Sequence, residues 1–434
     1  MPSRPALAFP IERHTLDNGL RVVLAPDRSA PVVAVAAYYD VGFRSEPEGR
    51  TGFAHLFEHM MFQGSEHLDK MEHVKHVMGN GGTLNGSTAP DYTNYYEAMP
   101  SSALDLALFL EADRMRSLRI TRENLDNQIS VVKEEIRVNV LNRPYGGFPW
   151  IHLAPVMFDS FANSHNGYGS FEDLEAAQVE DAADFWHRYY APGNAVLVVV
   201  GDFETGEARD LVERHFGDIR RRRVPRHPSF AEPIPAEPRR GRHHDPNAPT
   251  PALTLGYRIP DPVADPAGIA ALTVLSALLT DGEASVLRRR LVRDDGLVTD
   301  VSSWLGVFPG TTGPPERDPS RLQIMAFYPA PAARDGIVAA IDEEIARIAA
   351  GPDPDRVSGV VARLTGSYLR TVDGFLTRAL AIAPLEMFRG TAETVNEYPS
   401  MLAAVGADEV AAAAGRWLDP QARAELDLVA GGAE

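Results

Sequence analysis

Residues 52–62 read GFAHLFEHMMF, and this stretch decides how the rest of the chain is interpreted. On a helix, positions i, i+3 and i+4 share one face, so His55, Glu58 and His59 point the same way. The other residues are almost all apolar, which is typical of a helix that is buried on most sides. Burying two imidazoles and a carboxylate is costly without a partner, and a zinc ion bound by two histidines one turn apart is such a partner.

The order His-x-x-Glu-His is found among zinc hydrolases, in which the glutamate between the ligands handles water. The pattern also arises by chance on helices that carry two histidines, so a third ligand has to be found. A catalytic zinc has three protein ligands, and this chain has no cysteine to supply one. We therefore expect a carboxylate from another helix. Residues 128–138, QISVVKEEIRV, offer Glu134 and Glu135, and helical periodicity does not choose between them.

Length and composition bound the remaining possibilities. With 434 residues the chain is too long for one ordinary core, so two domains are expected. The formal net charge of -18 argues against binding nucleic acid or an anionic membrane through a basic surface. No run approaches the roughly 18 apolar residues of a membrane helix, and the first ten residues lack the apolar core of a signal peptide. We expect a cytoplasmic protein that binds neither nucleic acid nor membrane.

Patterning along the chain predicts an α+β protein with an internal duplication. Residues 17–19, Asp-Asn-Gly, predict a hairpin. A second helix, capped by Ser65 and ended by residues 79–82, is expected to carry His67, His73 and His76 as exposed positions. Each half mixes strands and helices: the expected strands are 31–39, 83–88, 91–97, 195–200, 252–257, 298–304, 323–328 and 424–430, and the expected helices include 101–118, 124–142, 181–190, 269–279, 284–293, 336–350, 357–369, 375–388 and 407–417.

The domain boundaries follow from a shift in composition. Residues 221–250 are rich in arginine and proline, contain His243 and His244, and carry little apolar content. We interpret them as a linker with an irregular lead-in, and the two histidines as solvated. The chain is thereby divided into a zinc-binding catalytic domain at 10–220, the linker at 221–250 and a homologous domain at 251–434.

The chain resembles the pitrilysin or insulinase family of zinc peptidases, which includes short bacterial members and the catalytic subunit of the mitochondrial processing peptidase. In that family a ligand glutamate ends a Val-Val-x-x-Glu segment roughly 75 residues after His-x-x-Glu-His. Here residues 131–135 read VVKEE, so the resemblance favours Glu135, with Glu134 as the less favoured alternative. Gln128 departs from the pattern, because many members have a glutamate there; glutamine can hydrogen-bond a ligand histidine but supplies no charge. Further matching landmarks are residues 17–23, Gly42, 81–88, 142–146, 190–195 and 200–202.

The resemblance implies two homologous α+β domains per chain, which pair with a second chain or chain-half into a clam-like chamber. It implies one zinc ion, held by His55, His59 and Glu135, that lowers the pKa of bound water, and Glu58 as the general base. The substrate would be an extended peptide or unfolded segment that adds to the edge of strand 83–88. Asn85 and Ser87 are candidate substrate contacts there, although a purely structural role fits them equally well.

The family also implies a substrate-binding arginine and tyrosine from the domain facing the zinc. The corresponding residues 291–300 read LVRDDGLVTD, which keeps Arg293 but places Thr299 where the tyrosine is expected. We therefore expect a heterodimer with a homologous chain that lacks the zinc motif, with a homodimer as the alternative. A rival interpretation is a non-catalytic or weakly active subunit of a peptidase-like assembly, but such subunits typically lose motif residues that this chain keeps. Another kind of zinc hydrolase is disfavoured by the additional landmarks.

Overall fold

The computed structural model describes residues 7–431. Residues 1–6, part of the stretch assessed for a signal peptide, lie outside the described residues, as do 432–434. The chain forms two compact units, each assembled from three segments. Unit 1 comprises Met1–Lys133, Gly167–Pro228 and Leu369–Glu397; unit 2 comprises Glu134–Asn166, Ser229–Tyr368 and Tyr398–Glu434. Each unit therefore includes one segment from the opposite half of the sequence.

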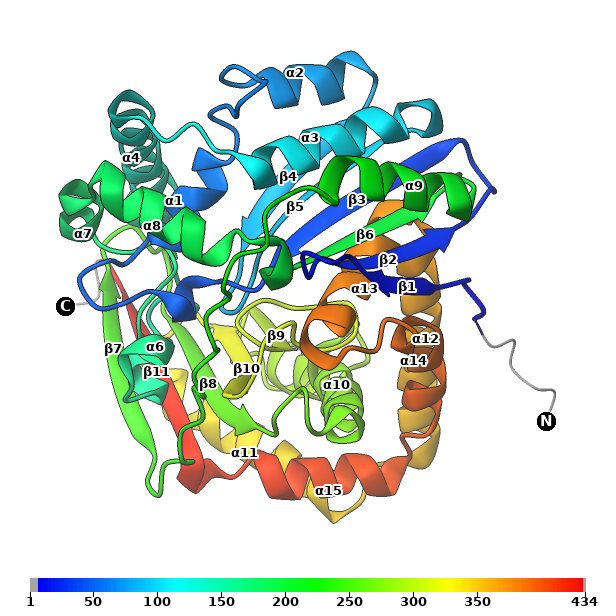
Figure 1. The fold of residues 1–434 in the computed structure, drawn as a ribbon. Helices are drawn as coiled ribbons and strands as arrows, with labels where there is room; N and C mark the ends of the chain where they lie inside the picture. The colour runs from blue at the N-terminus through cyan, green and yellow to red at the C-terminus, as the bar shows by residue number, and fades with distance from the viewer. Residues whose placement is uncertain (1–6, 432–434) are drawn as a thin grey trace. The chain divides into compact units, whose positions relative to one another are not determined.

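Unit 1 is built on a six-stranded sheet with the order β1-β2-β6-β3-β5-β4 (Figure 1). Only the β2–β6 pair is parallel. The central strands β3 and β6 are apolar and almost fully buried, as expected for strands covered on both faces. Within the described residues β4 pairs with β5 alone, so it forms an edge. The strands are β1 (Glu12–Thr15), β2 (Arg21–Pro26), β3 (Val32–Tyr39), β4 (Thr83–Thr88), β5 (Thr93–Pro100) and β6 (Ala195–Gly201).

Helices cover both faces of this sheet. Helices α3 and α9 lie on one face, and α13, which comes from the C-terminal part of the chain, packs along β3 and β6 on the other (Figure 1). Helix α1 packs on β4 and β5 at the edge of the sheet. The helices of unit 1 are α1 (Phe53–Met60), α2 (Glu72–Gly79), α3 (Leu104–Arg116), α7 (Phe171–Ala176), α8 (Val179–Tyr189), α9 (Thr205–Phe216) and α13 (Phe375–Arg389), and α4 (Arg122–Ile136) begins there.

Unit 2 repeats the same connectivity with five strands. Its order, β7-β11-β8-β10-β9, matches β2-β6-β3-β5-β4 strand for strand, with a parallel first pair and antiparallel pairs after it. The predictions of an α+β fold and of an internal duplication are thereby confirmed. Strand β7 lies inside residues 221–250, where we expected irregular structure. The strands are β7 (Arg239–Asp245), β8 (Ala252–Ile259), β9 (Asp300–Leu305), β10 (Ser320–Phe327) and β11 (Arg423–Ala430).

The segment 134–166 supplies part of the core of unit 2. Phe148, Leu153 and Met157, in and before helix α5 (Ala154–Met157), pack against Leu426 and Leu428 of β11. The exchange is reciprocal, because α13 fills the corresponding role in unit 1. The other helices are α6 (Phe161–Ser164), α10 (Pro266–Thr280), α11 (Arg334–Ala350), α15 (Ala407–Trp417), and α12 (Pro354–Asp373) and α14 (Thr394–Ala403), which carry the chain between the units.

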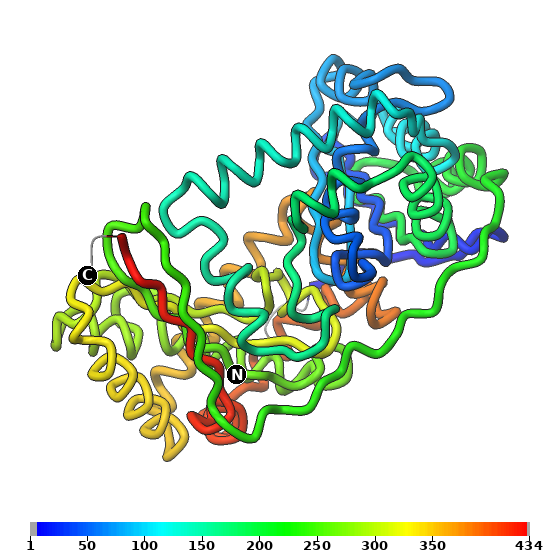
Figure 2. The backbone as a smooth tube through the Cα atoms, turned by 90° about the vertical axis from the view of Figure 1, so that its left-hand side faces the viewer, coloured from blue at the N-terminus to red at the C-terminus, as the bar shows by residue number. Residues whose placement is uncertain are grey.

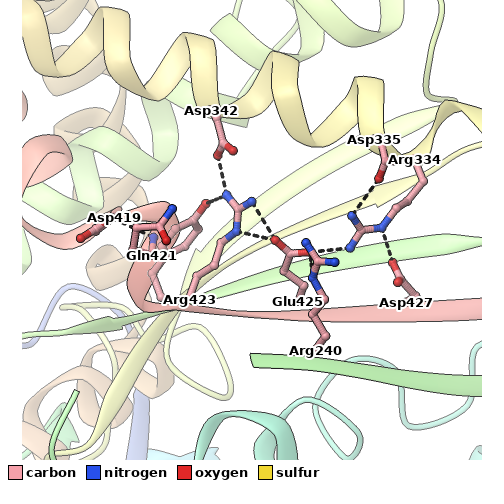
Figure 3. A network of polar contacts seen from close by, with 10 residues as sticks. Arg240, Arg334, Asp335, Asp342, Asp419, Gln421, Arg423, Glu425 and Asp427 are labelled. Atoms are coloured by element: carbon pink, nitrogen blue, oxygen red, sulfur yellow. Dashed lines mark hydrogen bonds and ion pairs between the residues drawn. The ribbon is translucent and has the colours of Figure 1, made fainter. Parts of the chain in front are cut away.

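An ionic network ties β11 to α11 in unit 2 (Figure 3). Glu425 accepts hydrogen bonds from Arg334 at 2.5 Å and from Arg423 at 2.8 Å. Arg334 also pairs with Asp427 at 3.0 Å, and Arg423 pairs with Asp342 of α11. Because Arg423 has two carboxylate partners and Arg334 has a third in Asp335, the charges of the network are compensated in place.

Two expectations about the second helix of unit 1 are wrong. Ser65 does not cap it: α2 starts at Glu72 after Met71, whose φ of 63° places it in the left-handed region, and the Ser65 hydroxyl donates to Asp113 at 2.5 Å instead. His67 and His76 are exposed as expected, but His73 is buried.

Among residues 7–431, no helix combines the length and apolar character needed to cross a membrane.

Candidate metal centre

The structure brings together three of the residues singled out in the sequence. His55 and His59 of α1 and Glu135 of α4 each offer one ligand atom, and these atoms lie within 4.8 Å of one another. The two imidazole rings are 4.9 Å apart between centroids and nearly perpendicular. All three residues are half-buried. Two imidazole nitrogens and one carboxylate oxygen, with no thiolate, are the donor set of a catalytic zinc rather than a structural one.

Helix α4 decides which of the two adjacent glutamates reaches the histidines. It is one continuous helix (Figure 2). Glu135 lies on this helix, two residues after Lys133, which ends the first segment of unit 1. Consecutive helical residues point about 100° apart, so only one of the pair faces α1. Glu134 is exposed and pairs with Arg137 at 3.1 Å. The geometry thus favours Glu135 as the third ligand.

Side chains of unit 1 anchor the first part of α4. Asn124 donates a hydrogen bond of 3.2 Å to the backbone oxygen of Gln63, just after α1. Lys133 pairs with Glu175 and lies 5.2 Å from the centre of the Phe171 ring. These contacts hold α4 beside the helix that carries the histidines, so the donor set depends on how two helices far apart in sequence are docked.

The N-terminus of α1 is stabilised by a residue that sequence reasoning missed. Glu46 is 3% exposed, and its carboxylate accepts hydrogen bonds from the backbone N–H groups of Gly52, at 2.9 Å, and Ala54, at 2.7 Å. An anion at this end of a helix is also favoured by the helix dipole. Gly52 has a φ of 84°, and a side chain there would meet the backbone oxygen of Tyr168. The sequence carried no signal for Glu46, because it lies in the preceding loop at no fixed capping distance.

Glu58 contacts the edge strand β4. The hydroxyl of Thr88 donates a hydrogen bond of 2.7 Å to Glu58 Oε2. A Cβ atom on Gly86 would lie 3.2 Å from Cγ of Glu58, so the strand passes close to this side chain. Neither residue was singled out in the sequence, although both lie in the segment 81–88 that resembles the family.

The two candidate substrate contacts in β4 lie on the opposite face. Side chains alternate along a strand, so Asn85 and Ser87 point away from the face that Gly86 and Thr88 present to Glu58. Asn85 is exposed, and its side-chain oxygen accepts a hydrogen bond from the N–H of Gly86 at 2.9 Å. Ser87 donates to Asn94 at 2.6 Å. A contact of Asn85 or Ser87 with a peptide beside Glu58 would therefore use the strand backbone.

The other candidate residues have local partners. Gln128 is buried, and its amide donates to Asn127 at 2.9 Å. Arg293 belongs to unit 2, where it is exposed and pairs with Glu283 at 3.0 Å. The Thr299 hydroxyl donates to the backbone oxygen of Phe327 at 3.1 Å. Tyr168, which sequence reasoning missed, packs edge-on against His55 with ring centroids 4.9 Å apart.

Two family models match different parts of the chain. Residues 21–144 match "Insulinase (Peptidase family M16)", and residues 176–364 match "Peptidase M16 inactive domain". The first range includes His55, Glu58, His59 and Glu135. The two models together span most of both halves of the sequence.

Individual relatives agree with these models. The chain is 31% identical to the zinc protease PqqE of Helicobacter pylori over 306 residues, which are 67% of this chain and 66% of that relative. The crystal structure of a protease from Helicobacter pylori has a TM-score of 0.86 at 24% identity, covering 97% of this chain and 99% of the other. A chain of complex III2 from Candida albicans has a TM-score of 0.78 at 13% identity, covering 96% of both. The two structural matches show a shared fold.

Proposed function

Because this chain belongs to the insulinase family, peptidase family M16, we propose that it is a zinc-dependent endopeptidase acting on extended peptides or unfolded segments. The observation that carries this proposal is the donor set of His55, His59 and Glu135 next to the carboxylate of Glu58. The match to a zinc protease supports the same metal.

The residues of the site have two different roles in the proposed reaction. His55, His59 and Glu135 would hold one zinc ion, which when bound supplies Lewis-acid polarisation and lowers the pKa of water. Glu58 is the proposed general base: it accepts a proton from the attacking water and later delivers it to the leaving amine. The Thr88 hydroxyl donates a hydrogen bond to Oε2 of Glu58, and this contact would orient the carboxylate for the proton transfer.

The edge of β4 is the proposed docking site for the substrate. An edge strand presents backbone N–H and C=O groups that can pair with an added strand. Since Gly86 and Thr88 contact Glu58, a peptide paired with β4 would pass close to the proposed base. Asn85 and Ser87 are proposed to contribute through their backbone groups.

We also propose that the active species is a heterodimer with a homologous chain that lacks the zinc motif. Arg293 is present, but Thr299 has a short side chain whose hydroxyl is engaged by the Phe327 backbone. Losing one donor to a developing oxyanion costs about 10²–10³ in rate, so a partner that supplies the missing phenol would restore activity. The purified chain should bind zinc but cleave peptides poorly until the partner is added. Full activity of the chain alone, unchanged by Thr299→Tyr, would favour the homodimer.

A second candidate function is a weakly active or non-catalytic subunit of a peptidase-like assembly. The observation favouring it is the match of residues 176–364 to an inactive domain. That match does not include the proposed ligands or Glu58, which all lie before residue 144.

The experiment that decides between these functions compares metal content with cleavage of an unfolded polypeptide. Glu58→Gln should retain zinc while cleavage falls by about 10²–10⁴-fold, because the base is lost and the ligands remain. His55→Ala, His59→Ala and Glu135→Ala should lose both zinc and cleavage. A zinc-loaded Glu58→Gln protein with undiminished cleavage would refute the mechanism. A wild-type chain that holds zinc but cleaves nothing, with or without a partner, would favour the non-catalytic subunit.

A further inference from the structure

Unit 1 contains a second cluster of ionisable side chains, separate from the metal centre. His73 comes from α2, Glu97 from β5, and Glu111 and Arg114 from α3; none is more than 5% exposed. His73, Glu97 and Glu111 each offer one ligand atom within 4.8 Å of the others. The proposed function uses none of these four residues, yet all are titratable or charged and removed from water.

The two carboxylates of the cluster have unequal partners. Arg114 donates to both oxygens of Glu111, through Nε at 3.0 Å and through Nη2. Within the described residues, neither oxygen of Glu97 and neither ring nitrogen of His73 has a hydrogen-bond partner. The nearest approach between them, His73 Nε2 to Glu97 Oε2, is 4.0 Å, which is too long for a hydrogen bond. Arg114 thus pairs with Glu111 through two of its guanidinium nitrogens, while the third, Nη1, is buried without a hydrogen-bond partner among the described residues.

The net charge of the cluster depends on whether one of its two carboxyl groups keeps a proton. With both glutamates ionised, Arg114 protonated and His73 neutral, the cluster has a net charge of −1 and no access to water. An uncompensated buried charge is strongly unfavourable. If one carboxylate keeps a proton, the cluster is neutral, and the acid O–H can donate to the neighbouring carboxylate or imidazole.

We propose that Glu97 is held as a neutral carboxylic acid at neutral pH, beside an ionised Glu111 that pairs with Arg114. Two carboxylates that share a small site cannot both ionise readily, and the one without the arginine retains the proton. Burial and the charge of Glu111 raise the pKa of Glu97 well above its usual value, against the opposing effect of Arg114. Burial lowers the pKa of His73 well below its usual value, so the imidazole is neutral.

The surrounding groups do not change this balance. The phenols of Tyr39 and Tyr95 are fully buried, and burial raises both of their pKa values, so they stay neutral. His76 and Arg114 disfavour a charge on His73. The buried phenol of Tyr190, which lies 3.2 Å from the Tyr95 hydroxyl, also has its pKa raised by burial and stays neutral. Among the described residues, the ionisable groups around the cluster thus include His76 from α2, Tyr39 from β3, Tyr95 from β5 and Tyr190.

A divalent cation is a weaker explanation for the same geometry. Added to two ionised glutamates and Arg114, it would change the net charge from −1 to +1, so one buried charge would replace another. A proton brings the net charge to zero without displacing Arg114 from Glu111. The proton therefore accounts for the arrangement better than a metal does.

The cluster is also linked through Tyr95 to α1, the helix that carries two of the three proposed zinc ligands. The Arg114 guanidinium carbon is 4.4 Å from the centre of the Tyr95 ring, and the Tyr95 hydroxyl donates to the backbone oxygen of Phe57 in α1 at 3.2 Å. Loss of the proton from Glu97 at alkaline pH would disturb this packing. The pKa of Glu97 is higher in the folded than in the unfolded chain. Its contribution to the free energy of unfolding is therefore largest below the unfolded-state pKa and is lost as the pH rises through the folded-state pKa.

The test applies the same substitution to both carboxylates of the full-length chain. Glu97→Gln reproduces the shape of a protonated acid, so the urea midpoint at pH 7 should be unchanged or higher, and its decline toward pH 10 should be shallower than in the wild type. The matched variant Glu111→Gln leaves Arg114 without its ionic partner, so the midpoint should shift to a lower urea concentration. An equal loss in both variants would overturn the proposal.

Two further measurements keep the proposal testable if a variant does not fold. The infrared spectrum of the wild-type protein at pH 7 should show the carbonyl band of a buried protonated carboxylic acid, and its absence would refute the assignment. Metal analysis should show that Glu97→Gln binds as many metal ions per chain as the wild type. A metal ion that is lost in Glu97→Gln but kept in Glu135→Gln would be bound by the cluster. Finding such a metal ion would show that a cation, not a proton, neutralises the cluster.

Discussion

The hydroxyl of Thr88 in edge strand β4 donates a 2.7 Å hydrogen bond to Oε2 of Glu58 in helix α1. The proposed base is thus oriented by the same strand that we propose to bind the substrate. A hydrogen bond to an ionised group contributes about 1.5–3 kcal/mol, which corresponds to roughly 10–100-fold in rate if it acts on the transition state.

We therefore expect Thr88→Val to lower kcat by roughly 10–100-fold while zinc content stays unchanged. Thr88→Ser, which keeps the hydroxyl, should retain most of the activity. Metal analysis combined with steady-state cleavage of one unfolded substrate checks both. Equal activity in the valine and serine variants would show that the hydroxyl does not position Glu58.

The choice between Glu134 and Glu135 predicts opposite effects of the same substitution at neighbouring positions. Glu135→Gln should deplete zinc after purification, because Glu135 is the carboxylate that lies with His55 and His59. Glu134→Gln should retain zinc, since Glu134 is exposed and pairs only weakly with Arg137 at the surface. Identical purification of the two variants makes each the control of the other, and the reverse ranking of metal content would contradict the assignment.

Some features of the site follow from local sequence patterns. Helical spacing alone places His55, Glu58 and His59 on one face, and strand patterning predicts β4 and β5 as neighbours. The choice of Glu135 came from resemblance, because periodicity treats two adjacent helical glutamates alike. What separates them is the docking of α4 against α1, through Asn124 and Gln63, and no single segment encodes that contact.

Other features depend on contacts that a pattern does not contain. Glu46 reaches the end of α1 from a loop, and Thr88 reaches Glu58 across an edge strand. His73 lies on a mostly polar helix, so its burial depends on how α2 packs. The sequence of β7 resembles a linker because its alternate residues, arginines and a histidine, are exposed at the edge of the sheet. Its partner strand β11 begins almost 180 residues later, so no local pattern predicts the pairing.

Removing the cap of α1 should destabilise the helix that carries both histidines. In Glu46→Gln, one amide oxygen replaces the two carboxylate oxygens that now accept from Gly52 and Ala54. Leaving one buried N–H unsatisfied costs about 1–3 kcal/mol, and the anion at the helix N-terminus is lost as well. We expect a lower melting temperature and faster loss of zinc to a chelator.

The exposed neighbour Glu48 supplies the control for this prediction. Glu48→Gln should change the free energy of unfolding by less than about 0.5 kcal/mol, as is usual for surface substitutions. If Glu46→Gln were as stable as Glu48→Gln and held zinc equally well, the proposed capping role would be wrong.

The last prediction concerns the pH dependence of stability in unit 2. Glu425 is 2% exposed, and burial alone would raise its pKa; the hydrogen bonds and charges of Arg334 and Arg423 outweigh burial and lower it below the usual 4.5 (Figure 3). A carboxylate with a depressed folded-state pKa stabilises the fold above its unfolded pKa, and this stabilisation is lost as the pH falls through the folded value. Glu425→Gln should therefore cost about 3 kcal/mol at pH 7, near the lower end for a broken buried pair, because Asp342 and Asp427 still compensate the arginines. The difference from the wild type should shrink progressively below pH 4.5 in urea unfolding.

Asp335→Asn is the matched control, since Asp335 pairs with the same Arg334 but is 92% exposed. Its effect on the free energy of unfolding should stay below about 1 kcal/mol at every pH. A Glu425→Gln penalty that persists unchanged into acid would show that shape, not charge, is what this residue contributes.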